Sequence, residues 1–112
     1  MTWPNLVQDW MCQTPITLVV EDEGLTEDGA PAEVFSAELL CNWQDGGKVE
    51  LTPEQKYVRI TGKALFPGDI CPEVPVIAAG YGIVDGARRT IAYGSKARNA
   101  DGSVNFTEVR FR

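Results

Sequence analysis

The side chains with the greatest intrinsic reactivity in this sequence are three cysteines, Cys12, Cys41 and Cys71. The chain has no histidine, which excludes a Ser or Cys nucleophile activated by a histidine base. The cysteines lie far apart and form no CxxC pair, so the usual spacing of a zinc site is absent. Their odd number also fits poorly with a secreted disulfide framework. We therefore expect three free thiols that act as small buried hydrophobic side chains.

A second group of possible ligands is a string of oxygen-bearing side chains near the C-terminus: Asn99, Asp101, Ser103, Asn105 and Glu108. These residues resemble calcium ligands, but the spacing and flanking helices of an EF-hand are missing, which favours a plain hairpin turn. The GxGxxxG pattern of residues 80–86 is not followed by a helix pattern, so it is no dinucleotide fingerprint. Asp69 follows Pro67-Gly68 and is typical of a turn residue. The sequence therefore predicts no catalytic, metal or cofactor site and no enzyme.

Basic side chains gather around the penultimate predicted strand, at Arg88, Arg89, Lys96 and Arg98. They can line a groove or lumen that meets phosphate, in which case binding would weaken steeply with added salt. They can equally form a solvated face of a hairpin. Tyr93 is the one aromatic residue interleaved with them, so a single-strand binding surface of the OB type is weakly supported. Both readings stay open at this point.

The charge of the chain is divided between its two halves. The net charge is −6, made of −10 over residues 1–55 and +4 over residues 56–112. The two signs can cancel across one fold whose strands interleave. Alternatively, an acidic and a basic surface can meet on neighbouring copies, in a head-to-tail contact that closes into a ring.

The first residues have the apolar spacing of a short helix. Thr2 and Pro4 are typical of a helix start, and apolar residues follow at steps of three and four: Trp3, Leu6, Val7, Trp10 and Met11. We expect a short docking helix over residues 1–12, which is marginal alone in water. It either caps the core of its own domain or anchors a partner through Trp3 and Trp10.

The remaining residues, 13–112, read as a β core. Alternating apolar patterns predict strands over residues 16–21, 34–43, 48–51, 57–66, 76–84, 88–93 and 104–111. Residues 22–32 are acidic and contain Gly and Pro, which favours a loop. Turns are expected at Asp45-Gly46-Gly47, Asp85-Gly86 and residues 99–102. We predict a single all-β domain over residues 1–112, a small antiparallel β-barrel or sandwich with a short N-terminal helix.

The strand over residues 57–66 is the one around which the chain is organised. Its even-numbered residues, 58–66, are apolar or small, whereas the odd-numbered ones are mostly polar, so one face can be buried. Gly62 in its middle indicates a bulge, a bend or a close approach of another group. Pro67-Gly68-Asp69 should end the strand.

Two stretches carry a resemblance to a known family. ALFPGDI at residues 64–70, followed by a Gly-rich strand and RRTIAYGSKARNADGSVNFTEVRF at residues 88–111, resembles the C-terminal half of small minor capsid or head–tail joining proteins of tailed phages and prophages of Gram-positive bacteria. The match covers about half the chain and rests on turns. Residues 1–50 contain no matching motif.

This resemblance implies a non-enzymatic virion protein at the neck between portal and tail, assembled in the cytoplasm of the bacterial host. It implies a homo-oligomeric ring through which DNA passes, with portal or adaptor and tail proteins as partners and no cofactor. On that view Arg88, Arg89, Lys96 and Arg98 are candidates for the DNA lumen or the subunit interface. Candidates for partner docking are Trp3, Trp10, Glu21, Asp22, Glu23, Glu27 and Asp28.

Two other function classes remain as alternatives. The first is a small β-barrel module that binds nucleic acid, and a distant second is an enzyme with a carboxylate site in a polar cleft. No apolar stretch approaches the roughly 20 residues of a membrane span, and the N-terminus has no signal-peptide pattern. We therefore expect a soluble protein that is not exported and does not enter a membrane.

Overall fold

The computed structural model describes residues 6–25, 31–51, 56–74 and 77–112. Its elements are the 3-10 helix η1 (Asp9–Met11) and the strands β1 (Thr14–Leu25), β2 (Pro31–Leu51), β3 (Tyr57–Pro67), β4 (Ala79–Val84), β5 (Ala87–Arg98) and β6 (Val104–Phe111). Every pairing between strands is antiparallel. The expectation of an all-β protein is therefore confirmed.

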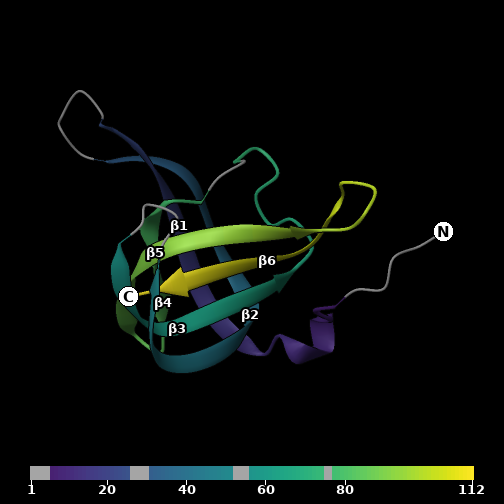
Figure 1. The fold of residues 1–112 in the computed structure, drawn as a ribbon, viewed down its shortest axis with the longest axis horizontal. Coiled ribbons are helices and arrows are strands. Elements are labelled where there is room, and N and C mark those ends of the chain that lie inside the picture. The colour runs from purple at the N-terminus through teal and green to yellow at the C-terminus, as the bar shows by residue number, and fades with distance from the viewer. Residues whose placement is uncertain (1–5, 26–30, 52–55, 75–76) are drawn as a thin grey trace.

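The six strands follow one another in the order β1-β2-β3-β6-β5-β4, and β4 pairs back with β1, so the sheet closes on itself (Figure 1). Inward-facing apolar side chains from all six strands fill the space inside it. The largest fully buried ones are Phe66, Phe111, Leu18, Ile91, Val20 and Val109. In the described ranges, each of the six strands therefore has a partner strand on both sides. This protects the sheet against edge-to-edge aggregation.

β3 has the alternation that the sequence predicts. Ile60, Gly62, Ala64 and Phe66 are buried, and the residues between them are half-buried. A Cβ at Gly62 would lie 2.3 Å from Cζ2 of Trp43, so the glycine permits close packing of the indole. β3 ends at Pro67, and Gly68 has a φ of 66°. The predicted end of this strand is therefore confirmed.

The Asp45-Gly46-Gly47 sequence forms a bulge and not a turn, which corrects the prediction. β2 continues through it: Asp45 pairs with Gly62 of β3, and Lys48 pairs with Ile60. Two residues of β2 are thus set against one of β3, and this disrupts the ladder locally. Gly-Gly permits a bulge as readily as a turn, and continued pairing with β3 decides between them.

The boundaries of other strands also differ from the prediction. β1 continues to Leu25, and β2 already begins at Pro31, so the acidic loop expected over residues 22–32 is shorter. β4 begins later than expected, at Ala79, and β5 continues to Arg98. The Asp85-Gly86 turn is confirmed, because both residues have positive φ (51° and 77°) and join β4 directly to β5.

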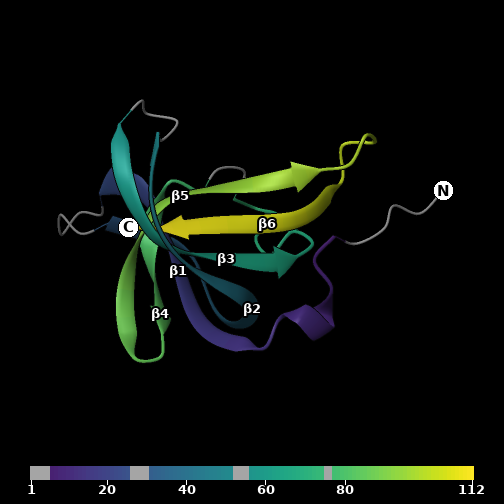
Figure 2. The same ribbon diagram turned by 60° about the horizontal axis from the view of Figure 1, so that its bottom comes forward.

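The predicted N-terminal helix over residues 1–12 is not present in the described part of the chain. Residues 6–12 contain only η1, where the Met11 N–H donates to the Gln8 carbonyl at 2.9 Å. Bonds to the β core replace a helix: the Leu6 N–H donates to Asn105 Oδ1, and the Cys12 thiol to the Leu65 carbonyl. So short a helix has little stability of its own, and these contacts outweigh it. η1 lies outside the closed sheet (Figures 1 and 2).

Candidate interaction surfaces

The four basic residues predicted to act together lie in two pairs, one at each end of β5. Arg88 and Arg89 begin the strand, and Lys96 and Arg98 end it. A strand of 12 residues is about 40 Å long when fully extended. The structure therefore separates the two pairs.

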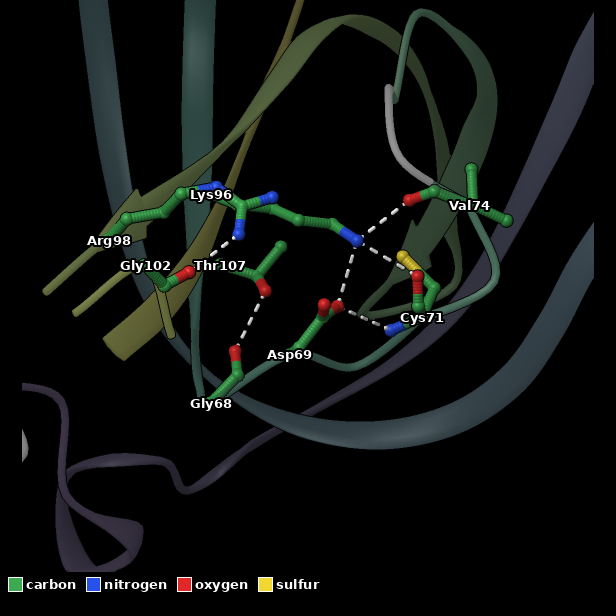
Figure 3. A network of polar contacts seen from close by, with 8 residues as sticks. All are labelled: Gly68, Asp69, Cys71, Val74, Lys96, Arg98, Gly102 and Thr107. Atoms are coloured by element: carbon green, nitrogen blue, oxygen red, sulfur yellow. Dashed lines mark hydrogen bonds and ion pairs between the residues drawn. The ribbon is translucent and has the colours of Figure 1, made fainter. Parts of the chain in front are cut away.

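Lys96 is buried, and its ammonium group is fully used within the chain. Nζ lies 2.9 Å from Asp69 Oδ1 and donates to the carbonyls of Cys71 (2.9 Å) and Val74 (2.7 Å), as Figure 3 shows. The side chain is 6% exposed. An ammonium has three donors, and each has a partner here. Lys96 therefore holds the fold together and presents no charge to phosphate.

The segment that Lys96 holds is the crossing of residues 68–74, which we call the clamped segment. Pro67 and Pro72 cannot donate to a β-ladder, so other groups hold this stretch. The Gly68 N–H donates to the Asn105 carbonyl at 3.0 Å, and the Gly68 carbonyl accepts from Thr107 Oγ1 at 2.8 Å (Figure 3). Asp69 Oδ1 also accepts from the Cys71 N–H. β5 and β6 thus fix the clamped segment through polar contacts.

Arg98 belongs to the hairpin that joins β5 to β6. Its Nη1 donates to the Gly102 carbonyl at 2.8 Å. In the same turn Asp101 Oδ1 accepts from both the N–H and the hydroxyl of Ser103, and Asn99 Oδ1 accepts from Asn105. The side-chain oxygens of Asn99 and Asp101, suggested as calcium ligands, therefore bond within the turn, as in a plain hairpin. Across the described ranges, no three Cys, Asp or Glu side chains gather as a metal site would need.

Arg88 and Arg89, although adjacent, lie on opposite faces of β5. Arg88 is exposed, and its guanidinium lies 3.9 Å from the ring centroid of Tyr81. Arg89 is half-buried, lies 5.1 Å from the ring centroid of Trp43, and donates to Thr61 Oγ1. Its Nε is buried without a hydrogen-bond partner among the described residues. Only Arg88 of this pair is placed to meet a partner, with its cation stacked on an aromatic ring.

The three cysteines are free and buried, as predicted. Burial raises the pKa of the Cys41 thiol to about 12, with a smaller contribution from nearby Cys12. The pKa of Cys71 is also raised, first by burial and then by Asp69, against the opposing effect of Lys96. Because the thiolate is the reactive form, Cys41 and Cys71 are poor nucleophiles at neutral pH.

The residues predicted for partner docking are placed only in part. Trp10 is 70% exposed, with its indole N–H 2.5 Å from Gln8 Oε1. Glu21 is half-buried and pairs in register with Glu33 of β2 and Ala79 of β4. Asp22 and Glu23 belong to β1, but their side chains lie outside the description, as do residues Trp3, Glu27 and Asp28 altogether. The structure thus leaves Trp10 as an exposed docking candidate.

An exposed groove on the outer face of β1, β2 and β4 was not predicted from the sequence. Its volume is about 470 Å³, and its lining consists of Pro15, Ile16, Thr17, Glu38, Leu39, Leu40, Ile83 and Asp85. Leu40 is 56% and Ile83 38% exposed. Leu40, like Val34, lies on the mostly polar parity of its strand, which is a signal in the sequence that could have indicated an apolar outer patch.

Comparison with protein-family models, with curated proteins and with solved structures yields no match. In the part of the chain that is described, no helix has the length and apolar character to cross a membrane. The function is therefore inferred from the arrangement of the residues themselves.

Proposed function

We propose that this protein is a non-enzymatic structural component of a phage or prophage virion, a minor capsid or head–tail connector protein of the head-closure type. In this proposal its closed sheet is a small β-barrel, and its copies form a ring at the neck, between portal or adaptor and tail proteins. The ring assembles in the host cytoplasm, and DNA passes through its lumen without sequence-specific contacts.

The observation that carries this proposal is that the stretches behind the family resemblance form one bonded unit. The turn at residues 66–70 contains Asp69, whose partner is Lys96 in the second stretch. The same turn contains Gly68, which is bonded to Asn105 and Thr107 in the last strand. The stretches that carry the resemblance are therefore bonded to one another in the fold. The neck assignment rests on this bonded unit of the chain.

The surface supports an assembling protein more than a catalytic one. Several large apolar side chains are exposed, among them Leu6, Trp10, Leu40, Val49 and Tyr57. Contiguous patches of such groups mark interaction surfaces, and Leu40 lies in one groove with Ile83. The polar groups around Lys96 are bonded to one another within the chain. Of the four proposed basic contacts, Arg88 and Arg98 are exposed and suit a lumen or subunit interface, whereas Lys96 is buried and Arg89 lies against Trp43.

The experiment that tests the proposal is negative-stain electron microscopy of the purified protein over a range of concentrations. We expect closed rings of one subunit number, with a central opening, to appear as concentration rises. Duplex DNA should bind the monomer weakly. A monomer at every concentration that instead binds DNA with a steep salt dependence would contradict the ring and support the nucleic-acid-binding module.

A further inference from the structure

The groove on β1, β2 and β4 has an apolar floor and an acidic rim, and we call it the acidic groove. Pro15, Leu40 and Ile83 provide exposed apolar surface, and Glu38 and Asp85 are exposed carboxylates in the lining. The registers Thr17 to Glu38 and Thr17 to Ile83 place Glu38 and Ile83 on the same outer face, on either side of β1. The acidic groove therefore suits an apolar group that is accompanied by a cation.

A surface of the complementary character lies on β2 and β3, and we call it the basic ridge. It consists of Val49, Tyr57 and Arg59. Val49 and Arg59 are paired in register, and Tyr57 lies two residues along β3 on the same face. Tyr57 is 79% and Val49 56% exposed, and Arg59 is also exposed. An exposed tyrosine beside an arginine is the composition typical of interface hot spots.

The basic ridge cannot fill the acidic groove of its own chain. Leu40 in the groove and Val49 in the ridge both belong to β2, and the eight residues between them place the two at most about 30 Å apart along the strand. Figure 2 shows the joined ends of β2 and β3 on one side of the molecule and the β4–β5 hairpin, which carries Asp85, on the opposite side. Contact between the two surfaces therefore requires two copies.

We propose that the basic ridge of one copy docks into the acidic groove of the next. Tyr57 enters between Leu40 and Ile83, where a tyrosine can bury roughly 150–250 Å², and Arg59 faces the carboxylates of Glu38 and Asp85. Charge complementarity sets the orientation and excludes ridge-to-ridge contacts. Because the two surfaces differ and lie on opposite sides, the contact is heterologous and repeats from copy to copy. The ring that it would close rests on the proposed function, whereas the contact itself does not.

A charge-reversal experiment tests this contact by sedimentation velocity. Glu38→Arg and Arg59→Glu should each raise the concentration for half-assembly by about tenfold or more. The double variant Glu38→Arg/Arg59→Glu restores opposite charges across the contact and should recover much of the wild-type assembly. Matched controls are Glu33→Arg, the same change at an exposed position of β2 outside the groove, and Arg112→Glu. Both controls should assemble as the wild type does, and circular dichroism verifies that each variant is folded.

The possible results separate this contact from the proposed function. Assembly that persists in both single variants would overturn the contact while leaving the ring intact. Charge-sensitive assembly into open filaments would support the contact and contradict the ring. A wild-type protein that stays monomeric at all concentrations would overturn both. Loss of assembly in the single variants without any recovery in the double variant would also count against the proposed pairing of Arg59 with Glu38.

Discussion

The clamped segment and the acidic groove use their polar side chains in opposite ways. Asp69 of the clamped segment and Lys96 of β5 are paired with each other and with backbone groups. The lysine side chain is nearly inaccessible. In the acidic groove Glu38 and Asp85 are exposed beside Leu40 and Ile83. Lys96, which the sequence suggests as a phosphate contact, thus bonds within the fold, and the surface that suits a partner is largely apolar. A buried ion pair is costly to break from one side, whereas a contiguous exposed apolar patch marks an interaction surface.

The largest effect on the free energy of unfolding is expected when the bonds from Lys96 to the clamped segment are removed. Lys96→Met keeps the apolar stem but leaves Asp69 and the Cys71 and Val74 carbonyls without their donor. Removal of one member of a buried ion pair costs about 3–5 kcal/mol in the free energy of unfolding, which urea denaturation measures. Arg98→Met at the exposed end of the same strand is the control and should cost less than about 1 kcal/mol. Equal losses in the two variants would show that the buried pair is not special.

A second substitution tests the close approach of β4 to β1, two of the strands that carry the acidic groove. Gly80 has a φ of 130°, and a Cβ there would lie 2.1 Å from the Val19 carbonyl oxygen. Gly80→Ala forces β4 away from β1 and should reduce the free energy of unfolding by about 2–4 kcal/mol. Gly46→Ala is the matched control, since its Cβ would lie 3.7 Å from the Ile60 carbonyl oxygen. A Gly80→Ala variant as stable as the control would contradict the close approach of these two strands.

The third prediction concerns the effect of pH on stability through the buried thiol of Cys41. Burial raises the pKa of Cys41 in the folded protein to about 12, from an ordinary value of 9.0. Between these values the folded state binds more protons than the unfolded state, so stability is full below pH 9 and falls as pH rises towards 12. The loss is about 1.4 kcal/mol per pH unit in that window. Urea denaturation of wild type and Cys41→Ala at pH 8 and 10.5, under reducing conditions, measures it. An equally steep decline in Cys41→Ala would attribute the effect to other groups.

The fold was predictable where the pattern along one strand was sufficient. The alternation of β3 and its end at Pro67 follow from local sequence, as does the Asp85-Gly86 turn. The bulge of β2 was not predictable, because Gly46-Gly47 permits both a turn and a bulge until β3 pairs across it. The N-terminal helix was predicted from local signals, a helix start at Thr2 and Pro4 and the apolar spacing after it. Those signals cannot show the bond from Leu6 to Asn105, which lies at the far end of the chain.

The candidate surfaces were less predictable, because their residues come from different strands. The sequence around Lys96 does not indicate that the lysine bonds to Asp69 and to two backbone carbonyls. From sequence alone, Lys96 is therefore indistinguishable from the three nearby arginines as a candidate phosphate contact. Leu40 and Ile83 belong to β2 and β4, and only β1 between them makes one groove. The basic ridge was overlooked for the same reason, since Val49 and Arg59 meet through pairing of β2 with β3.

The most direct test of the division between the two regions is sedimentation velocity of wild type, Lys96→Met and Glu38→Arg under conditions in which all three are folded. We predict that wild type and Lys96→Met form the same assembly, whereas Glu38→Arg remains monomeric at the same concentration. A Glu38→Arg variant that assembles as the wild type does, or a folded Lys96→Met variant that loses assembly, would contradict the assignment of stability to the clamped segment and of interaction to the acidic groove.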